Sequence, residues 1–154
     1  MDRAPQIKPK QEAERKLIEK ATLWVEEQSR ITLEKGEPLS DREIALARAV
    51  GVEHPELVRI LEVDKISVPA DPDLKVLAEA TGLLPVKGMT FDHGIQILKG
   101  QRANWLVSHE LRHVYQYEQA GSIKAFLSAY LPQLLSDGYF NAPLEIDARN
   151  HEQE

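Results

Sequence analysis

The chain contains no cysteine and no long apolar run. Without cysteine it has neither a disulfide nor a thiolate to offer a metal, so any metal site must use histidine and carboxylate side chains. Residues 1–16 are charged and hold no apolar stretch, so we expect neither a secretory signal nor a membrane anchor in them. The absence of cysteine also fits a reducing compartment, and we expect a cytoplasmic protein.

The chain also lacks a run of basic residues. Its 25 acidic and 19 basic side chains give a net charge of −6, which argues against nucleic acid as the principal partner. A length of 154 residues with 42% hydrophobic content supports one domain with a sizeable core. Within that single compact unit we distinguish an N-terminal helical extension, residues 1–38, from the main domain, residues 39–154.

The most informative segment is His109-Glu110-Leu111-Arg112-His113, an HExxH arrangement. On a helix, His113 lies about 40° round from His109 and Glu110 about 100°, so the three side chains share one sector. Neutral imidazoles bind Zn²⁺ at about 2.0–2.1 Å, and a catalytic zinc leaves one position to water. Glu110 can take a proton from that water. The spacing therefore predicts one zinc ion held by His109 and His113, with Glu110 as general base.

Two plainer interpretations of this segment remain open. The histidines could be ordinary polar residues of a surface helix, or the site could hold a metal without catalysing a reaction. The surrounding helix, about residues 102–119 and ended by Gly121, favours a built site. Its apolar residues Val107, Leu111 and Val114 lie opposite the proposed ligands and should pack into a core. Other residues fall on the ligand side, namely Arg102, Gln116 and Tyr117.

A third ligand must come from elsewhere in the chain. Glu118 lies about 140° away from the ligand face and cannot reach the metal from a straight helix. His93 is an alternative, but we expect it to be an ordinary hydrogen-bonded histidine of a strand. The downstream candidates are Asp137, Glu145, Asp147, His151, Glu152 and Glu154, of which the last three belong to a polar tail expected to fray.

Glu145 is the strongest of these candidates, because residues 141–149 have the pattern of a helix start. Asn141 can cap this helix, and Pro143 is tolerated in its first turn. Ala148, one turn after Glu145, would let the helix approach the HExxH helix closely. The alternative is that Glu145 is simply an acid placed favourably at a helix N-terminus.

The order of an HExxH helix, about thirty residues, and then a glutamate on a second helix resembles the gluzincin branch of the zincin metallopeptidases. More narrowly, residues 88–94, 109–118 and 143–148 resemble a group of uncharacterised bacterial zincin-like proteins, and the resemblance extends over about residues 39–150. It implies zinc at His109, His113 and Glu145, Glu110 as the catalytic base, and an edge strand before the active-site helix that pairs with extended substrate.

The chain departs from the wider family at one position. Larger gluzincins commonly carry an aspartate four residues after the ligand glutamate, where it supports a ligand histidine, and here that position is Arg149. We therefore expect the support to come from Asp147, Asp137 or a backbone carbonyl.

Two further segments flank the proposed site. Residues 89–97 alternate in polarity, which predicts a strand or a bulged pair with Gly94 at the irregularity. Residues 123–135 form an amphipathic helix capped by Ser122 and bent at Pro132, after which Asp137-Gly138 should turn the chain back toward the histidines. Tyr130 or Tyr139 could stabilise the oxyanion formed in hydrolysis, although tyrosines at such positions are more often packing residues.

The N-terminal half carries further predicted elements. A charged helix over residues 11–33 has one narrow apolar face, which should pack against another part of the chain or against a partner. A capping box of Ser40 and Glu43 begins a helix through Val50. We predict a short helix at 55–61, a strand at 65–68 and a helix at 71–80 ended by Gly82.

Together these patterns predict an α+β, zincin-like fold that is helix-rich, with a small sheet. The expected reaction is zinc-dependent hydrolysis of a peptide bond in a peptide or protein substrate. One alternative is a metal-binding interaction or regulatory module, in which the N-terminal helix docks a protein partner and the peptidase site is vestigial. Another is a latent peptidase whose residues 1–38 cover the cleft.

Overall fold

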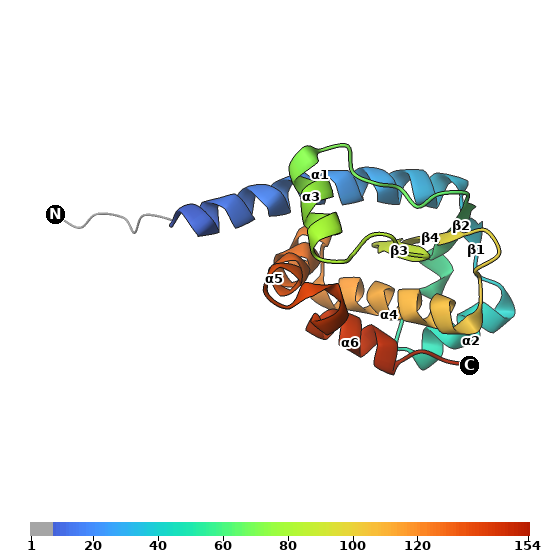
Figure 1. Cartoon of the computed structure of the whole chain (residues 1–154). Helices are drawn as coiled ribbons and strands as arrows, with labels where there is room; N and C mark the ends of the chain where they lie inside the picture. Colours follow the sequence, from blue (N-terminus) through green and yellow to red (C-terminus); the bar gives the residue numbers. More distant parts are fainter. Residues whose placement is uncertain (1–7) are drawn as a thin grey trace.

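The computed structural model describes residues 8–154, which form an α+β fold (Figure 1). The described chain contains six α-helices, one short 3₁₀ helix and a four-stranded mixed sheet. In chain order the elements are α1 (Pro9–Lys35), β1 (Glu37–Pro38), α2 (Asp41–Ala49), the 3₁₀ helix η1 (Pro55–Leu57), β2 (Arg59–Val63), α3 (Pro72–Ala80), β3 (Gly88–Phe91), β4 (Gly94–Leu98), α4 (Asn104–Ala120), α5 (Ile123–Asn141) and α6 (Pro143–Asn150). None of these helices has the length and apolar character needed to span a bilayer.

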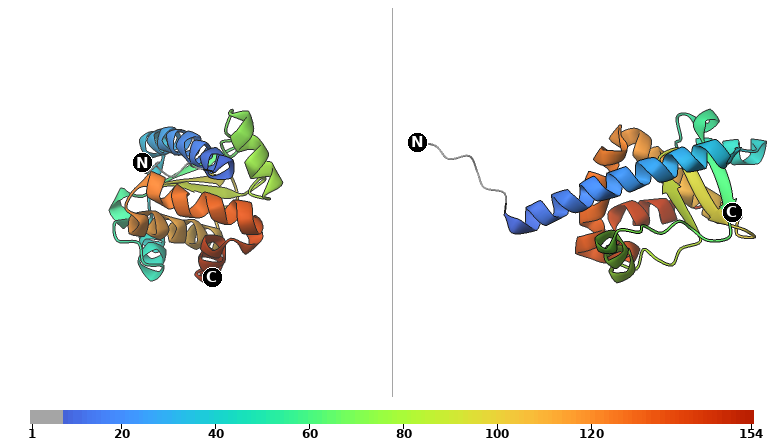
Figure 2. Two further views of the ribbon diagram at one scale, coloured as in Figure 1. Left: turned by 90° about the vertical axis from the view of Figure 1, so that its left-hand side faces the viewer. Right: turned by 90° about the horizontal axis from the view of Figure 1, so that it is seen from above.

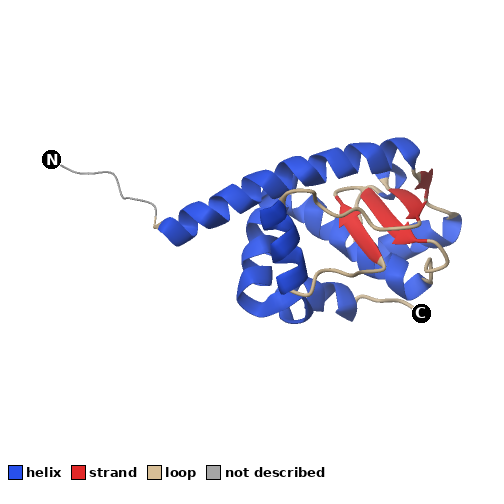
Figure 3. Cartoon of the chain, turned by 45° about the horizontal axis from the view of Figure 1, so that its top comes forward, coloured by secondary structure: helices blue, strands red, loops and turns tan. Residues whose placement is uncertain are grey.

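The sheet has the strand order β1-β2-β4-β3 and lies among the helices (Figure 3). Strand β2 runs parallel to β4, whereas the other two pairings are antiparallel. In the central strands, fully buried Ile60 is paired with Ile95. Because β3 is the last strand in this order, one of its edges is free of strand pairing.

Helices cover both faces of the sheet, α1 on one side and α4 on the other (Figures 1 and 2). Ile60, Ile95 and Ile97 pack with Val107 and Leu111 in one apolar cluster. On the opposite face, Phe91 meets Trp24 of α1 edge to face, with ring centroids 5.4 Å apart. Successive side chains of a strand point to opposite faces of the sheet, so the strands contribute to two separate apolar cores, one beneath α1 and one beneath α4.

Helix α1 is part of the core along its second half. Its narrow apolar face docks on the sheet and on α5, as predicted, and buries Ala21 and Val25. Thr32, also buried, accepts a hydrogen bond from Gln96 of β4 at 3.3 Å. The N-terminal end of α1 projects beyond the rest of the molecule (Figure 2). The expected boundary at residue 38 falls within the sheet, on β1.

In the first two thirds of the chain, two local predictions were wrong and a third was wrong in part. The expected helix at 55–61 is a 3₁₀ turn followed by β2, because pairing with β4 outweighs local propensity. The expected strand at 65–68 is irregular, and there the N–H of Ser67 bonds to the side chain of Gln96. Residues 89–97, expected to form a strand or a bulged pair with Gly94 at the irregularity, are extended as predicted, but they form a hairpin whose turn is Asp92-His93, with Asp92 at φ 60°, and Gly94 begins β4.

The helices around the site agree more closely with the sequence patterns. Ser40 and Glu43 form the predicted capping box of α2, and Gly121 ends α4 in the left-handed conformation. Ser122 caps α5, and Gly138 kinks that helix with φ 76° and ψ 168°, a conformation that favours glycine. The chain therefore turns back into α6 as expected. Asn141 does not cap α6, because it still belongs to α5 and Ala142 occupies the cap position.

Candidate metal site

Helix α4 presents its two histidines on the side away from the sheet. Its apolar residues Val107, Leu111 and Val114 are fully buried in the core beneath the sheet, as their spacing predicted. His109 and His113 are also buried, with 5% and 6% of their surfaces exposed. The ligand face is buried because α5 and α6 pack against α4. Both imidazoles therefore lie in a protected site rather than on a surface helix.

Helix α6 brings Glu145 to these histidines. Ala148, one turn further along, is fully buried where α6 meets α4, so a small side chain permits the close approach. Oε1 of Glu145 lies 3.2 Å from Nε2 of His109 and 3.2 Å from Nε2 of His113. The three side chains each offer one ligand atom, and these atoms lie within 4.8 Å of one another. The structure thus brings together the three residues predicted as ligands.

The donor set and its spacing suit zinc. Two ligands that each lie about 2.0–2.1 Å from a tetrahedral metal are about 3.3 Å apart, close to the 3.2 Å between Glu145 and each imidazole. Two imidazole nitrogens and one carboxylate oxygen are also a common ligand set of catalytic zinc, which keeps a fourth position for water. The two spacings between Glu145 and the imidazoles therefore suit a tetrahedral ion, and the three side chains together could hold a metal.

Each histidine turns its other ring nitrogen to a hydrogen-bonding partner. Nδ1 of His109 lies 2.8 Å from Oε2 of Glu152, and Nδ1 of His113 lies 2.7 Å from Oε1 of Gln116. Such partners fix the ring orientation and leave Nε2 facing the ligand cluster. The expectation that the tail after α6 frays was wrong at this point, because Glu152 bonds to His109 and the N–H of Gln153 donates to Ser108 at 2.8 Å.

Neither of the two aspartates predicted to support a ligand histidine bonds to His109 or His113. Asp147 does not contact a histidine of the cluster directly but holds Gln116, the partner of His113. Its carboxylate accepts from Nε2 of Gln116 at 2.9 Å and pairs with Arg112 at 2.8 Å. Asp137 is exposed on α5 and contacts Ser136. Arg149 turns away from the histidines and donates to the carbonyl of Phe140. Sequence reasoning missed the support from Glu152 entirely, whereas Gln116 was signalled by its place on the ligand face.

Glu110 is buried beside the ligands and is held by β3. Thr90 donates its hydroxyl to Oε1 of Glu110 at 2.9 Å and also lies 3.1 Å from the carbonyl of Glu110. A Cβ atom at Gly88 would lie 3.2 Å from Cγ of Glu110, so the absence of a side chain there gives the carboxylate its room. Burial raises the pKa of Glu110, although the two histidines act in the opposite direction.

The three ligand side chains also form a hydrogen-bonded ionic cluster. Burial alone would lower the pKa of His113, but the Glu145 carboxylate beside it outweighs burial and raises that pKa to about 9. Burial raises the pKa of Glu145, yet the imidazole of His113 and the hydrogen bond from His109 hold it well below its usual range. The same atoms that can hold a cation can therefore satisfy one another.

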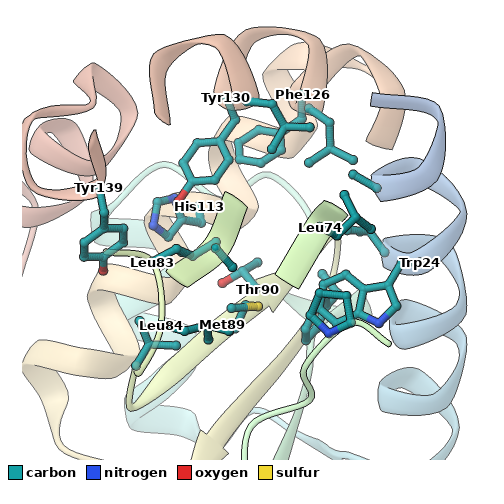
Figure 4. A pocket seen from close by; sticks show the side chains of 18 of the residues that line it. Trp24, Leu74, Leu83, Leu84, Met89, Thr90, His113, Phe126, Tyr130 and Tyr139 are labelled. Atoms are coloured by element: carbon teal, nitrogen blue, oxygen red, sulfur yellow. The ribbon is translucent and has the colours of Figure 1, made fainter. Parts of the chain in front are cut away.

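The two tyrosines considered for oxyanion binding differ in their contacts. Tyr130 donates its hydroxyl to Oε2 of Glu145 at 2.6 Å, so it orients the carboxylate. Tyr139 follows the kink of α5 and lies near Tyr130 and His113 at the rim of a cavity (Figure 4). Burial raises the pKa of both phenols, so both keep a hydroxyl that can donate.

His93 lies outside the cluster. It is hydrogen-bonded as predicted, although in a turn rather than a strand, with Nε2 at 3.1 Å from Glu118 and Nδ1 at 3.6 Å from Asp92. Glu118 also accepts from the backbone N–H groups of Glu53 and His54. Glu118 therefore fixes the loop that precedes η1, and it is not part of the His109, His113 and Glu145 group.

An apolar cavity of about 90 Å³ opens beside the ligand cluster. Its walls come from α1, α3, β3, α5 and the segment between α3 and β3 (Figure 4), and Glu110, His113 and Glu145 are among the residues that line it. The site therefore combines a candidate metal centre with an adjoining hydrophobic space.

Comparisons of the chain with protein-family models, with curated proteins and with solved structures gave no match.

Proposed function

We propose that this chain is a zinc-dependent peptidase of the gluzincin type with a zincin-like fold. The proposal rests above all on one observation, the convergence of His109, His113 and Glu145 at 3.2 Å spacings next to the buried carboxylate of Glu110. The order of elements supports it as well. An edge strand precedes the HExxH helix, and a glutamate-bearing helix follows it, as the resemblance to zincins implies.

The surrounding residues suit water-mediated hydrolysis. A Zn²⁺ ion bound here would polarise the substrate carbonyl and acidify an attacking water. Glu110 would accept the proton of that water and later deliver it to the leaving amine. The hydrogen bond from Thr90 holds Oε1 of Glu110 beside β3, and the other carboxylate oxygen would accept the proton. Tyr130 holds Glu145 and thereby keeps the ligand carboxylate in place.

The edge of β3 supports a peptide as the substrate. Met89 and Phe91 form hydrogen-bonded pairs with β4, so Gly88 and Thr90 direct their backbone groups to the side of β3 that has no strand partner. On that side the carbonyl of Thr90 also accepts from the hydroxyl of Tyr117 at 3.4 Å. An extended peptide can add to such an edge by main-chain hydrogen bonds. At Gly88 this edge passes close to Glu110, so a peptide bound there would run beside the base.

The direct test is a set of single substitutions on the full chain, with zinc measured by elemental analysis and hydrolysis measured on a peptide mixture. Glu110→Gln should retain one equivalent of zinc and lose turnover, whereas His109→Ala, His113→Ala and Glu145→Ala should lose zinc. Glu26→Gln, an exposed glutamate of α1, is the control and should change neither. An unchanged rate in Glu110→Gln would refute the assigned base, and undiminished zinc affinity in Glu145→Ala would refute the third ligand.

A second candidate is a binding module in which this cluster is structural. The observation that favours it is the mutual pairing of Glu145 with both histidines and with Tyr130, which satisfies the polar groups without a cation. This candidate predicts substoichiometric zinc after purification without chelator and no hydrolysis of any peptide.

A further inference from the structure

The cavity beside the ligand cluster is apolar almost throughout. Its lining includes Trp24 from α1, Leu74 from α3, Leu83 from the segment before β3, and Phe126 from α5 (Figure 4). The charged groups that line it, Glu110, His113 and Glu145, are neighbours of one another and belong to the candidate metal site. A ligand that fills this space would therefore place an apolar group deep in the cavity and its polar part at the candidate metal site.

The size of the cavity limits what can enter. At about 90 Å³ it is smaller than the cavity of about 150 Å³ that is known to admit benzene. A compact aliphatic group is therefore a better fit than an aromatic ring. A charged group is excluded because the far walls offer it no partner, and burying an unpaired charge is costly.

We propose that this cavity is a specificity pocket for an aliphatic side chain, such as that of leucine, isoleucine or methionine, in the residue next to the scissile bond. The inference rests on the proposed peptidase function. A residue whose side chain enters the cavity has its backbone beside Glu110 and His113, where hydrolysis would occur. The free edge of β3 borders the same space through Gly88 and Thr90, so strand pairing and side-chain insertion are compatible.

If the cavity is a specificity pocket, helix α1 forms part of the substrate site. Ala21, Trp24 and Val25 of α1 form one wall of the cavity, so α1 shapes the substrate site. Across the cavity, Ala78 of α3 is 4% exposed. A larger side chain at Ala78 would occupy the pocket, whereas truncating Leu83, which lies at the partly exposed rim, would enlarge it.

The test uses the zinc-loaded full chain with Ala78→Leu to fill the pocket and Leu83→Ala to enlarge it. Ala80→Leu is the matched control, because Ala80 is exposed on the same helix and outside the cavity. Calorimetry measures the binding of leucine, glycine and phenylalanine hydroxamates, and a parallel assay measures cleavage of peptides that differ only at one residue beside the scissile bond. We expect the unmodified chain to bind leucine hydroxamate at least about tenfold more tightly than glycine hydroxamate.

The variants should then shift this preference in opposite directions. Ala78→Leu should abolish the preference for leucine, Leu83→Ala should admit phenylalanine, and Ala80→Leu should behave as the unmodified chain. Equal binding of leucine and glycine hydroxamates, or an unchanged preference in both pocket variants, would overturn the pocket while leaving peptide hydrolysis intact. Failure to cleave any peptide, with the binding preference retained, would instead count against the peptidase function and not against the pocket. Leu83→Ala keeps the test decisive if Ala78→Leu does not fold.

Discussion

The carboxylate of Glu152 lies 2.8 Å from Nδ1 of His109, although Glu152 follows α6 and stands seven residues beyond Glu145 in the chain. A carboxylate behind a ligand histidine fixes its tautomer and raises its basicity. In the gluzincins, to which we propose that the chain belongs, an aspartate at the position of Arg149 commonly has this role. Here Arg149 points to Phe140, and the support comes from just after the helix end.

Glu152→Ala should weaken zinc binding by about 10- to 100-fold, because His109 loses the partner that orients its ring. Glu152→Gln keeps an oxygen that can accept a hydrogen bond, so its loss should be smaller. Competition with a chelator of known affinity measures the effect. Glu154→Ala alters the same tail at an exposed position and is the control. Equal zinc affinity in Glu152→Ala and Glu154→Ala would show that the contact does not support the ligand.

Thr90→Val should reduce turnover by roughly 10- to 100-fold with zinc content unchanged. The substitution conserves shape but removes the hydroxyl that donates to Glu110 at 2.9 Å, and hydrogen bonds to charged groups contribute about 1.5–3 kcal/mol. Thr90→Ser retains the hydroxyl and should retain most of the activity. The rate of peptide hydrolysis and the zinc content are measured on the same samples. If Thr90→Val and Thr90→Ser turn over at the same rate, Thr90 does not position the base.

Local patterns predicted the parts of the site that depend on a single helix. The spacing of Val107, Leu111 and Val114 sets the buried face of α4, so the orientation of His109 and His113 followed from the sequence. The helix around Glu145 was also anticipated, because Pro143 marks its start and Ala148 its contact face. These features are local, and they hold because packing reinforces the helical periodicity.

Features that depend on contacts between distant segments were missed. Strand β2 was mistaken for a helix, because Ile60 owes its strand conformation to pairing with β4 and not to its neighbours in the chain. Glu152 was assigned to a fraying tail, because nothing in the polar sequence around it indicates the bond to His109. The role of α1 as a cavity wall could not be foreseen either, since Trp24 meets Phe91 only in the folded chain.

His93 should make folding stability depend on pH near neutrality. Its pKa is raised by the neighbouring carboxylate of Asp92 and, against burial, by that of Glu118, so the folded state binds a proton more tightly than the unfolded state. This contribution is fully present below the unfolded pKa of about 6.5 and is lost as the pH rises through the raised pKa. Urea unfolding of the unmodified chain and of His93→Gln should therefore differ more at about pH 6 than at about pH 9. A difference that grows toward alkaline pH would contradict this assignment.

Removal of residues 1–38 should unfold the protein rather than activate it. The segment includes Ala21 and Val25 in the core, and Thr32, which accepts from Gln96 of the sheet. A latent peptidase covered by this segment would instead keep a cooperative thermal transition and gain hydrolytic activity when the segment is deleted. Circular dichroism during heating and the peptide assay separate these outcomes.

A pair of point substitutions in α1 tests the same assignment without deleting a segment. Val25→Ala should destabilise the fold by about 2 kcal/mol, because it removes buried methyl groups from a side chain that is 5% exposed. Leu23→Ala, on a side chain that is 70% exposed, should change stability by less than about 0.5 kcal/mol. If the two substitutions cost the same, α1 does not share the core with the part of the chain that carries the candidate metal site. The proposed pocket would then lose the wall that Trp24 and Val25 provide.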